Sequence, residues 1–136
     1  MTVRNWGPVR DCMRKDVTEV DGRLDVLSAL KIMKKVGATA LIVKRRDEND
    51  EYGMLLFSDI AKKVMAKDRS PERVNVYEIM AKPVLTVRPD MEIRYCARLF
   101  ENFGVSHAPV VDGDEIVGMV SYYLLVLHGL LPVLED

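Results

Sequence analysis

The hydrophobic positions of this chain follow the same order of elements twice. Between Leu24 and Val36 apolar residues recur at every third or fourth position, which is the spacing of a helix with one buried face. Gly37 follows where a left-handed C-terminal cap is favoured. The pattern therefore predicts an amphipathic helix over Arg23–Val36 that ends at Gly37.

Two short apolar runs and a further helix follow this helix in the first half. The charged run Lys44–Glu51 separates the two runs, and such a run usually forms a solvent-exposed hairpin tip. Ser58 or Asp59 is placed to cap the next helix through its side-chain oxygen. The elements predicted here are strands Ala40–Lys44 and Tyr52–Phe57 and helix Ile60–Lys67.

The second half repeats this order with a clearer hairpin signal. The turn Asp112–Glu115 contains Asp-Gly between β-branched runs, and glycine supplies the positive φ that tight hairpin turns need. The strands predicted on either side are His107–Val111 and Ile116–Ser121. The other elements predicted from the pattern are short turns Val9–Met13 and Val76–Met80, strands Val17–Val20 and Val84–Val87, and helices Met91–Phe103 and Tyr122–Leu131.

Equivalent residues of the two halves are separated by a constant number of positions. The offset is 67 for Met13/Met80, Val17/Val84, Val20/Val87, Gly37/Gly104 and Val43/Val110. It becomes 65 for Gly53/Gly118 and Met54/Met119, because the first hairpin loop is two residues longer. This register predicts a duplicated β-α-β-β-α unit of mixed α/β (α+β) class. We divide it into residues 1–68, with the lead-in and first repeat, and residues 69–136, with the linker and second repeat.

Composition and charge exclude several classes of function. The 20 basic and 21 acidic residues give a net charge of −1, without the basic excess of a nucleic-acid-binding protein. The apolar end of the chain is shorter than the roughly 20 residues of a spanning helix. Cys12 and Cys96 lack metal or redox spacing, which is typical of buried thiols in a reducing compartment. We expect a cytoplasmic protein with no nucleic-acid or membrane partner, no metal and no catalytic group.

Together these motifs resemble the CBS domain family, the modules named after cystathionine β-synthase. The resemblance covers roughly residues 9–130, and the order of the motifs carries it rather than any single one. The matching elements are Val76-x-x-x-Met80, Val84-x-x-Val87-x-Pro89-Asp90, His107-Ala-Pro109-Val-Val-Asp112 and Gly118-Met-Val-Ser121, with weaker counterparts at Val9-x-x-x-Met13, Val17-x-x-Val20, Gly37 and Gly53–Ile60.

The resemblance implies two repeats packed about a pseudo-twofold axis, with two clefts between them. Many members bind adenine nucleotides (AMP, ADP, ATP) or S-adenosylmethionine in these clefts and regulate an enzyme, channel or transporter. The family's ribose carboxylate is the Asp of a G-h-h-[ST]-x-x-D pattern at the last helix of each repeat. The first repeat keeps Asp59 but has Leu56 in place of the hydroxyl residue, and the second keeps Ser121 but has Leu124 in place of the carboxylate.

The resemblance therefore predicts one usable cleft rather than two. In related pairs the carboxylate of one repeat faces the strands of the other, so Asp59 would bind the ribose, Thr86 the adenine edge and His107 a phosphate. The predicted ligand-binding set is Asp59, Thr86, Val87, Ser106, His107, Ala108 and Pro109. Other interpretations stay open, since Asp59 also suits a plain helix cap and His107 an ordinary hydrogen-bonded histidine.

The last helix predicts an assembly. It is apolar almost all the way round, and a helix on the face of a small domain can bury only one side. We expect a homodimer through this helix, with Tyr123, Leu124, Leu127 and Leu131 in the interface. The leading functional hypothesis is a regulatory sensor of an adenine nucleotide or S-adenosylmethionine that signals to a protein partner. The alternative is a ligand-free dimerisation or docking module whose clefts have decayed.

Overall fold

The computed structural model describes residues 6–135, with side chains as far as Leu131. The chain forms two compact units. One comprises Thr18–Val84, and the other combines the segment up to Val17 with everything from Leu85 onwards. Each unit has a small sheet covered by helices, which confirms the predicted mixed α+β class. Each unit is described separately below.

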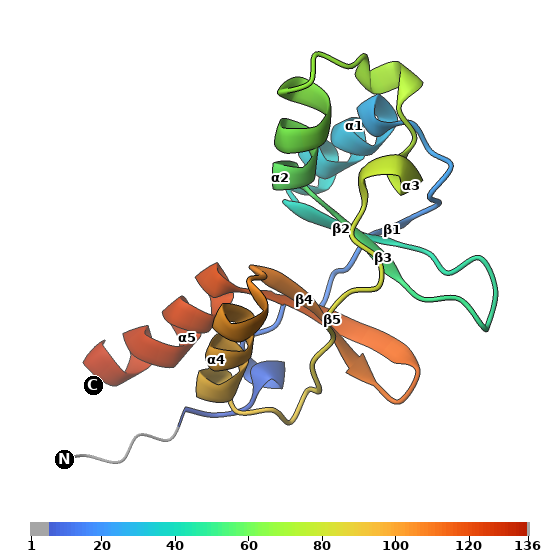
Figure 1. The fold of residues 1–136 in the computed structure, drawn as a ribbon. Helices are drawn as coiled ribbons and strands as arrows, with labels where there is room; N and C mark the ends of the chain where they lie inside the picture. Colours follow the sequence, from blue (N-terminus) through green and yellow to red (C-terminus); the bar gives the residue numbers. More distant parts are fainter. Residues whose placement is uncertain (1–5, 136) are drawn as a thin grey trace. The chain divides into compact units, whose positions relative to one another are not determined.

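The Thr18–Val84 unit contains a three-stranded sheet in the order β1-β2-β3 (Figure 1). β1 pairs in parallel with β2, and β2 pairs antiparallel with β3. The strands are β1 (Glu19–Val20), β2 (Ala40–Val43) and β3 (Gly53–Leu56), and the helices are α1 (Val26–Val36), α2 (Phe57–Ile60) and α3 (Val76–Ile79). A π-helical turn, Ala61–Met65, continues α2, and a 3-10 turn, Pro71–Arg73, precedes α3.

Local capping explains where α1 begins and ends. The Asp25 carboxylate accepts a hydrogen bond from the backbone N–H of Ser28 at 2.9 Å, so the helix begins at Val26 rather than at Arg23. Gly37 ends it in the left-handed conformation, with φ 69°. Gly104 ends α4 (Ile93–Phe103) in the same way, with φ 66°. Both predicted glycine caps are confirmed.

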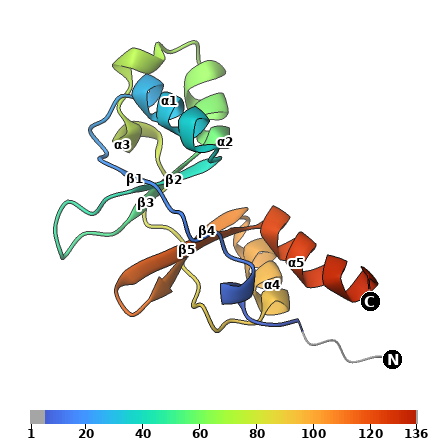
Figure 2. The same ribbon diagram turned by 180° about the vertical axis from the view of Figure 1, so that it is seen from behind.

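The second unit is built on a hairpin of β4 (His107–Asp112) and β5 (Glu115–Ser121). Helix α4 and helix α5 (Tyr122–Glu135) lie side by side against this hairpin (Figure 2). A 3-10 turn at Val9–Asp11 replaces the helical turn predicted near the start of the chain. The strand predicted over Val84–Val87 is reduced to one parallel bridge from Val87 to Val110, because few of its backbone groups find a partner.

Each unit has its own hydrophobic core. In the first unit, α1 contributes Val26, Ala29 and Met33, which pack against the inward residues of β2 and β3. In the second, Phe100 is fully buried and its ring meets Tyr122 edge-on, with 5.3 Å between the ring centres. The two buried cysteines, Cys12 and Cys96, belong to this second core. Burial raises the pKa of Cys12 to about 11 and that of Cys96 to about 12, so both are neutral thiols.

Short segments are exchanged between the two sequence repeats. The segment before the first repeat packs with the second, and the segment that opens the second packs with the first. The boundary drawn from the repeats at residue 68 therefore differs from the division made by the contacts. The equivalent backbone bridges, related by the same offsets of 67 and 65, are Pro8 to Glu92 with Asn75 to Asp25, and Arg14 to Met119 with Ala81 to Met54.

Candidate functional site

Asp59 lies in the first turn of α2, in the Thr18–Val84 unit. One of its carboxylate oxygens accepts a hydrogen bond from the backbone N–H of Leu56 at 2.9 Å. The other oxygen lies 3.8 Å from the Lys63 ammonium, and the Asp59 side chain is 15% exposed. Asp59 therefore caps α2 from within its first turn. The helix begins at Phe57, three residues before the predicted start.

The equivalent turn of the second unit is capped from the opposite direction. There the Ser121 hydroxyl accepts from the backbone N–H of Leu124 at 3.4 Å. A complete capping box needs both bonds, one from a hydroxyl at the helix start and one from a carboxylate three residues later. Each repeat has kept one half. The two incomplete sequence patterns thus have a structural role that needs no ligand, and only Asp59 leaves a carboxylate beside its helix.

Thr86 and Val87 lie next to β4 in the second unit. The Val87 N–H donates to the Pro109 carbonyl at 3.0 Å, and the Val111 N–H donates to the Val87 carbonyl at 2.9 Å. Val87, Ala108 and Pro109 are buried, whereas Thr86 is exposed. Thr86 is therefore an exposed residue directly before the single backbone bridge that Val87 makes with β4.

Ser106 and His107 form a hydrogen-bonded pair at the start of β4. The Ser106 hydroxyl and the His107 Nδ1 are 2.8 Å apart, and both side chains are partly buried. Burial lowers the pKa of His107 below its ordinary value, because desolvation disfavours the charged imidazolium. A neutral imidazole is a weak ligand for a phosphate. The phosphate role predicted for His107 is therefore not favoured by its surroundings.

Basic side chains near these residues are largely engaged within the protein. The Lys63 ammonium donates to the Ile79 carbonyl at 3.0 Å as well as lying near Asp59. Arg88 pairs with Asp90 at 3.2 Å. Second-unit members of the predicted ligand set thus lie together on neighbouring strands, while Asp59 belongs to the other unit. Among residues 6–135 there is no group of three or more side chains suited to holding a metal ion.

His107 makes the stability of the fold dependent on pH. In the unfolded chain its pKa returns to about 6.5, above the value in the folded protein. The unfolded state therefore takes up a proton first as the pH falls. The stabilising contribution is complete above about pH 6.5 and is lost as the pH falls through the folded pKa.

We expect His107→Gln to lose less stability than the wild-type chain when the pH is lowered from about 7.5 to about 5, as measured by urea unfolding at both pH values. His128→Gln, at an exposed position of α5, is the control, and equal losses in wild type and His107→Gln would contradict the assignment.

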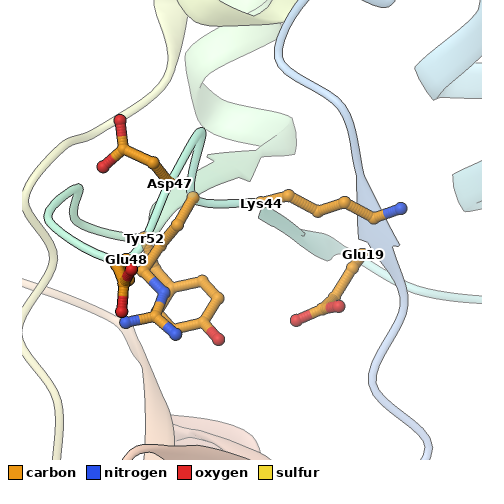
Figure 3. A pocket seen from close by; sticks show the side chains of 6 residues that line it. Glu19, Lys44, Asp47, Glu48 and Tyr52 are labelled. Atoms are coloured by element: carbon orange, nitrogen blue, oxygen red, sulfur yellow. The ribbon is translucent and has the colours of Figure 1, made fainter.

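The charged run between β2 and β3 is mostly exposed, as predicted for a hairpin tip, with one shielded carboxylate. The Asp50 side chain is only 8% exposed and binds both Arg46, at 3.0 Å, and Lys82, at 2.8 Å. A pocket of about 270 Å³ opens beside this loop. Figure 3 shows Tyr52 and Glu48 on one side of it and Lys44 and Glu19 on the other. Three carboxylates and two cations line this pocket, so neither sign of charge dominates it.

Solved structures similar to this chain come from CBS-domain proteins. Two structures of a hexameric CBS-CP12 protein from bloom-forming cyanobacteria are 36% and 34% identical, with TM-scores of 0.86 and 0.89. They cover 88% and 93% of this chain, and this chain covers 66% and 73% of theirs. The CBS domain pair of protein MJ0100, in complex with 5′-methylthioadenosine and S-adenosyl-L-methionine, is 26% identical with a TM-score of 0.74 over 87% of this chain and 95% of that one.

A curated relative places a similar region inside a longer protein. A homoserine O-acetyltransferase of Methanosalsum zhilinae is 34% identical over 113 residues, which are 82% of this chain. This chain spans 22% of that transferase, and 58% of a 30% identical protein of Methanopyrus kandleri. The comparison therefore concerns about a fifth of the transferase and not the transferase as a whole.

The predicted homodimer through the last helix is wrong. The similar CBS-CP12 structures are hexameric and not dimeric. Helix α5 does expose apolar surface, with Tyr123 71% and Leu131 44% exposed, whereas Leu124 and Leu127 are partly buried. Such a surface does not define the number of subunits that would cover it, and for this reason the sequence pattern misled the prediction.

No helix described between residues 6 and 135 has the length and apolar character required to cross a membrane.

The sequence pattern of the CBS domain matches this chain at two successive regions. These are residues 9–66 and 76–126, which together make up most of the chain and coincide with the two repeats. The fold of each unit, the register of the duplication and the solved relatives agree with this match. The chain belongs to the CBS domain family and is a tandem pair of CBS domains.

Proposed function

We propose that this chain is a cytoplasmic regulatory CBS pair that binds an adenosine-type ligand and signals its presence to a partner protein. The observation that carries the proposal is the 26% identical CBS pair of MJ0100, which binds 5′-methylthioadenosine and S-adenosyl-L-methionine. Two free buried cysteines suit the reducing cytoplasm. Asp59 is proposed as the ribose acceptor and Thr86 as a partner of the adenine edge, supported by Val87, Ala108 and Pro109.

The chemistry of these residues favours a ligand with little negative charge. The lowered pKa of His107 keeps its imidazole neutral, and the Ser106 hydroxyl already lies 2.8 Å from it. Lys63 and Arg88 are engaged with other groups of the protein. A triphosphate would lack strong cationic partners here. We therefore propose S-adenosylmethionine or methylthioadenosine rather than ATP, ADP or AMP as the preferred ligand.

The proposed partner is an enzyme of small-molecule metabolism. A relative 34% identical over 113 residues occurs within a chain named homoserine O-acetyltransferase. In that chain the matched region and an enzyme are covalently joined. We propose that this CBS pair has a comparable regulatory relation to an enzyme, without being an enzyme itself.

Binding can be tested by isothermal titration calorimetry with S-adenosylmethionine, methylthioadenosine, AMP and ATP. We expect saturable binding of the first two, and weaker or no binding of ATP. Asp59→Asn keeps an oxygen that can cap the Leu56 N–H but removes the charge. It is expected to weaken binding about tenfold, the typical effect of losing a charge-assisted hydrogen bond.

A matched control separates a ligand contact from a general loss of charge. Asp112→Asn removes an exposed carboxylate at the end of β4 and should leave affinity unchanged. An unaltered affinity in Asp59→Asn would contradict the assigned ribose contact. Absence of saturable binding for all four compounds would contradict the sensor function and favour a docking module that uses no ligand.

A further inference from the structure

A second and larger pocket lies wholly within the Thr18–Val84 unit, at the opposite end of β2 from Ala40. Its volume is about 750 Å³, within the usual range for sites that hold small molecules. Three separate segments of the chain supply its walls: the loop before α1, the end of β2 with the following loop, and the segment around α3. The cations that line it are Arg23, Lys44, Arg45, Arg46 and Lys82.

Carboxylates hold three of these cations in place. The Arg23 guanidinium donates to both oxygens of Asp21, at 3.1 and 2.9 Å. Asp50 lies behind the pocket and accepts hydrogen bonds from Arg46 and Lys82. These donors lower the pKa of Asp50, which remains ionised at any physiological pH. The two carboxylates position the basic groups without neutralising the whole set.

Lys44 and Arg45 provide the positive charge in excess. Within residues 6–135 neither has a carboxylate within 4 Å. The Arg45 guanidinium instead lies over the Tyr52 ring, 4.8 Å from its centre, a cation–π contact that orients it and leaves its charge intact. Five cations line this pocket, whereas Asp21 is the one carboxylate among its lining residues and Asp50 lies behind it. Lys44 and Arg45 also border the smaller pocket, which Glu19, Asp47 and Glu48 line.

The remaining wall is apolar and aromatic. Tyr77 is 53% exposed and lines the pocket together with Met80. Gly22 allows this wall to approach β2 closely, because a Cβ there would lie 3.3 Å from Val43 Cγ1 and 3.4 Å from Tyr77 Cβ. The Tyr77 N–H also donates to the Gly22 carbonyl at 2.9 Å. The Tyr77 backbone is thereby held beside the loop before α1, and its exposed side chain lines the pocket, where it can contact an organic group.

We propose that this pocket binds a small molecule bearing a diphosphate or triphosphate group. Guanidinium groups bind phosphate oxygens in pairs, and several cations converging on one cavity favour a ligand with more than one negative charge. The Tyr77 face would contact the organic part of a phosphorylated metabolite. None of the residues in this pocket belongs to the proposed adenosine-binding set, so the chain would respond to two chemically different signals.

The test uses the full chain and inorganic pyrophosphate, titrated by calorimetry at low and at physiological salt. Saturable binding at one site per chain is expected, with inorganic phosphate binding more weakly. The double variant Lys44→Gln/Arg45→Gln should bind pyrophosphate at least about tenfold more weakly, since it removes two charged donors. In NMR spectra, the Gly22 and Tyr77 amide signals should shift on addition of pyrophosphate. A nucleoside diphosphate that binds more tightly than pyrophosphate would identify Tyr77 as the contact for the organic group.

A second double variant controls for overall charge. Lys34→Gln/Lys35→Gln removes the same charge from exposed positions near the end of α1 and should leave pyrophosphate affinity unchanged. An equal loss of affinity in both double variants, or no saturable binding to the wild-type chain, would overturn the proposal. S-adenosylmethionine binding should be the same in Lys44→Gln/Arg45→Gln as in the wild type, so failure of one site is distinguished from failure of the other.

Discussion

Replacing Phe100 by alanine is expected to reduce the free energy of unfolding by about 3–5 kcal/mol, the usual cost of deleting a buried aromatic ring. Phe100 is fully buried in the second core and packs edge-on against Tyr122. It also joins α4 to the first turn of α5, so its removal leaves a cavity between two helices. Chemical denaturation followed by circular dichroism measures this change directly.

The same helix offers a matched control three residues later. Phe103 is 63% exposed, and Phe103→Ala should alter stability by no more than about 0.5 kcal/mol. The two substitutions remove the same atoms from the same helix and differ only in burial. Equal destabilisation by both variants would contradict the described orientation of α4.

Replacing Gly118 by alanine is expected to cost about 1–3 kcal/mol through overpacking. A Cβ at this position would lie 2.6 Å from the Met13 Sδ and 2.9 Å from the Arg14 carbonyl oxygen. The methionine side chain can move, but the carbonyl cannot do so freely. Arg14 and Met119 exchange two backbone hydrogen bonds of 2.9 Å, which fix the lead-in segment against β5. Urea unfolding of the variant measures the cost.

A second substitution separates the two contacts. In a chain that already carries Met13→Ala, Gly118→Ala should lower the free energy of unfolding by less than it does in the wild type. Part of the cost should remain, because the Arg14 carbonyl is still in place. Asp114→Ala, at an exposed position in the same hairpin, controls for a general effect on the β4–β5 turn. Wild-type stability in Gly118→Ala would contradict the close approach of the lead-in segment to β5.

The duplication and the helix ends follow from local patterns that the sequence displays directly. The stripe from Leu24 to Val36 requires only the helical period, and Gly37 and Gly104 end their helices because glycine adopts the left-handed conformation without strain. The offsets of 67 and 65 are read from the sequence alone, since they are differences between the positions of matching residues in the two repeats. The bridges Asp25 to Asn75 and Pro8 to Glu92 obey the same offset.

The candidate sites depended on contacts that no local pattern records. The sequence displays Asp59 and Ser121 as members of an incomplete motif, but only the structure shows that each supplies one half of a capping box. The basic pocket was missed because its cations are widely separated in the sequence, from Arg23 to Lys82. The run at Lys44–Arg46 was its one visible signal, and its charges alone are typical of an ordinary exposed loop.

The sequence by itself determined the class of fold, the two repeats and the family, because periodicity, caps and turn residues act over a few neighbouring positions. Only the tertiary structure decided which segments pair across the chain. Met13 lies against Gly118 of the second repeat, and Met80 lies against Gly53 of the first. These contacts, like the burial of Asp50 and of His107, join residues that are distant in sequence. Such contacts depend on the whole packed unit, whose free energy is shared among many residues and is not specified by any one segment.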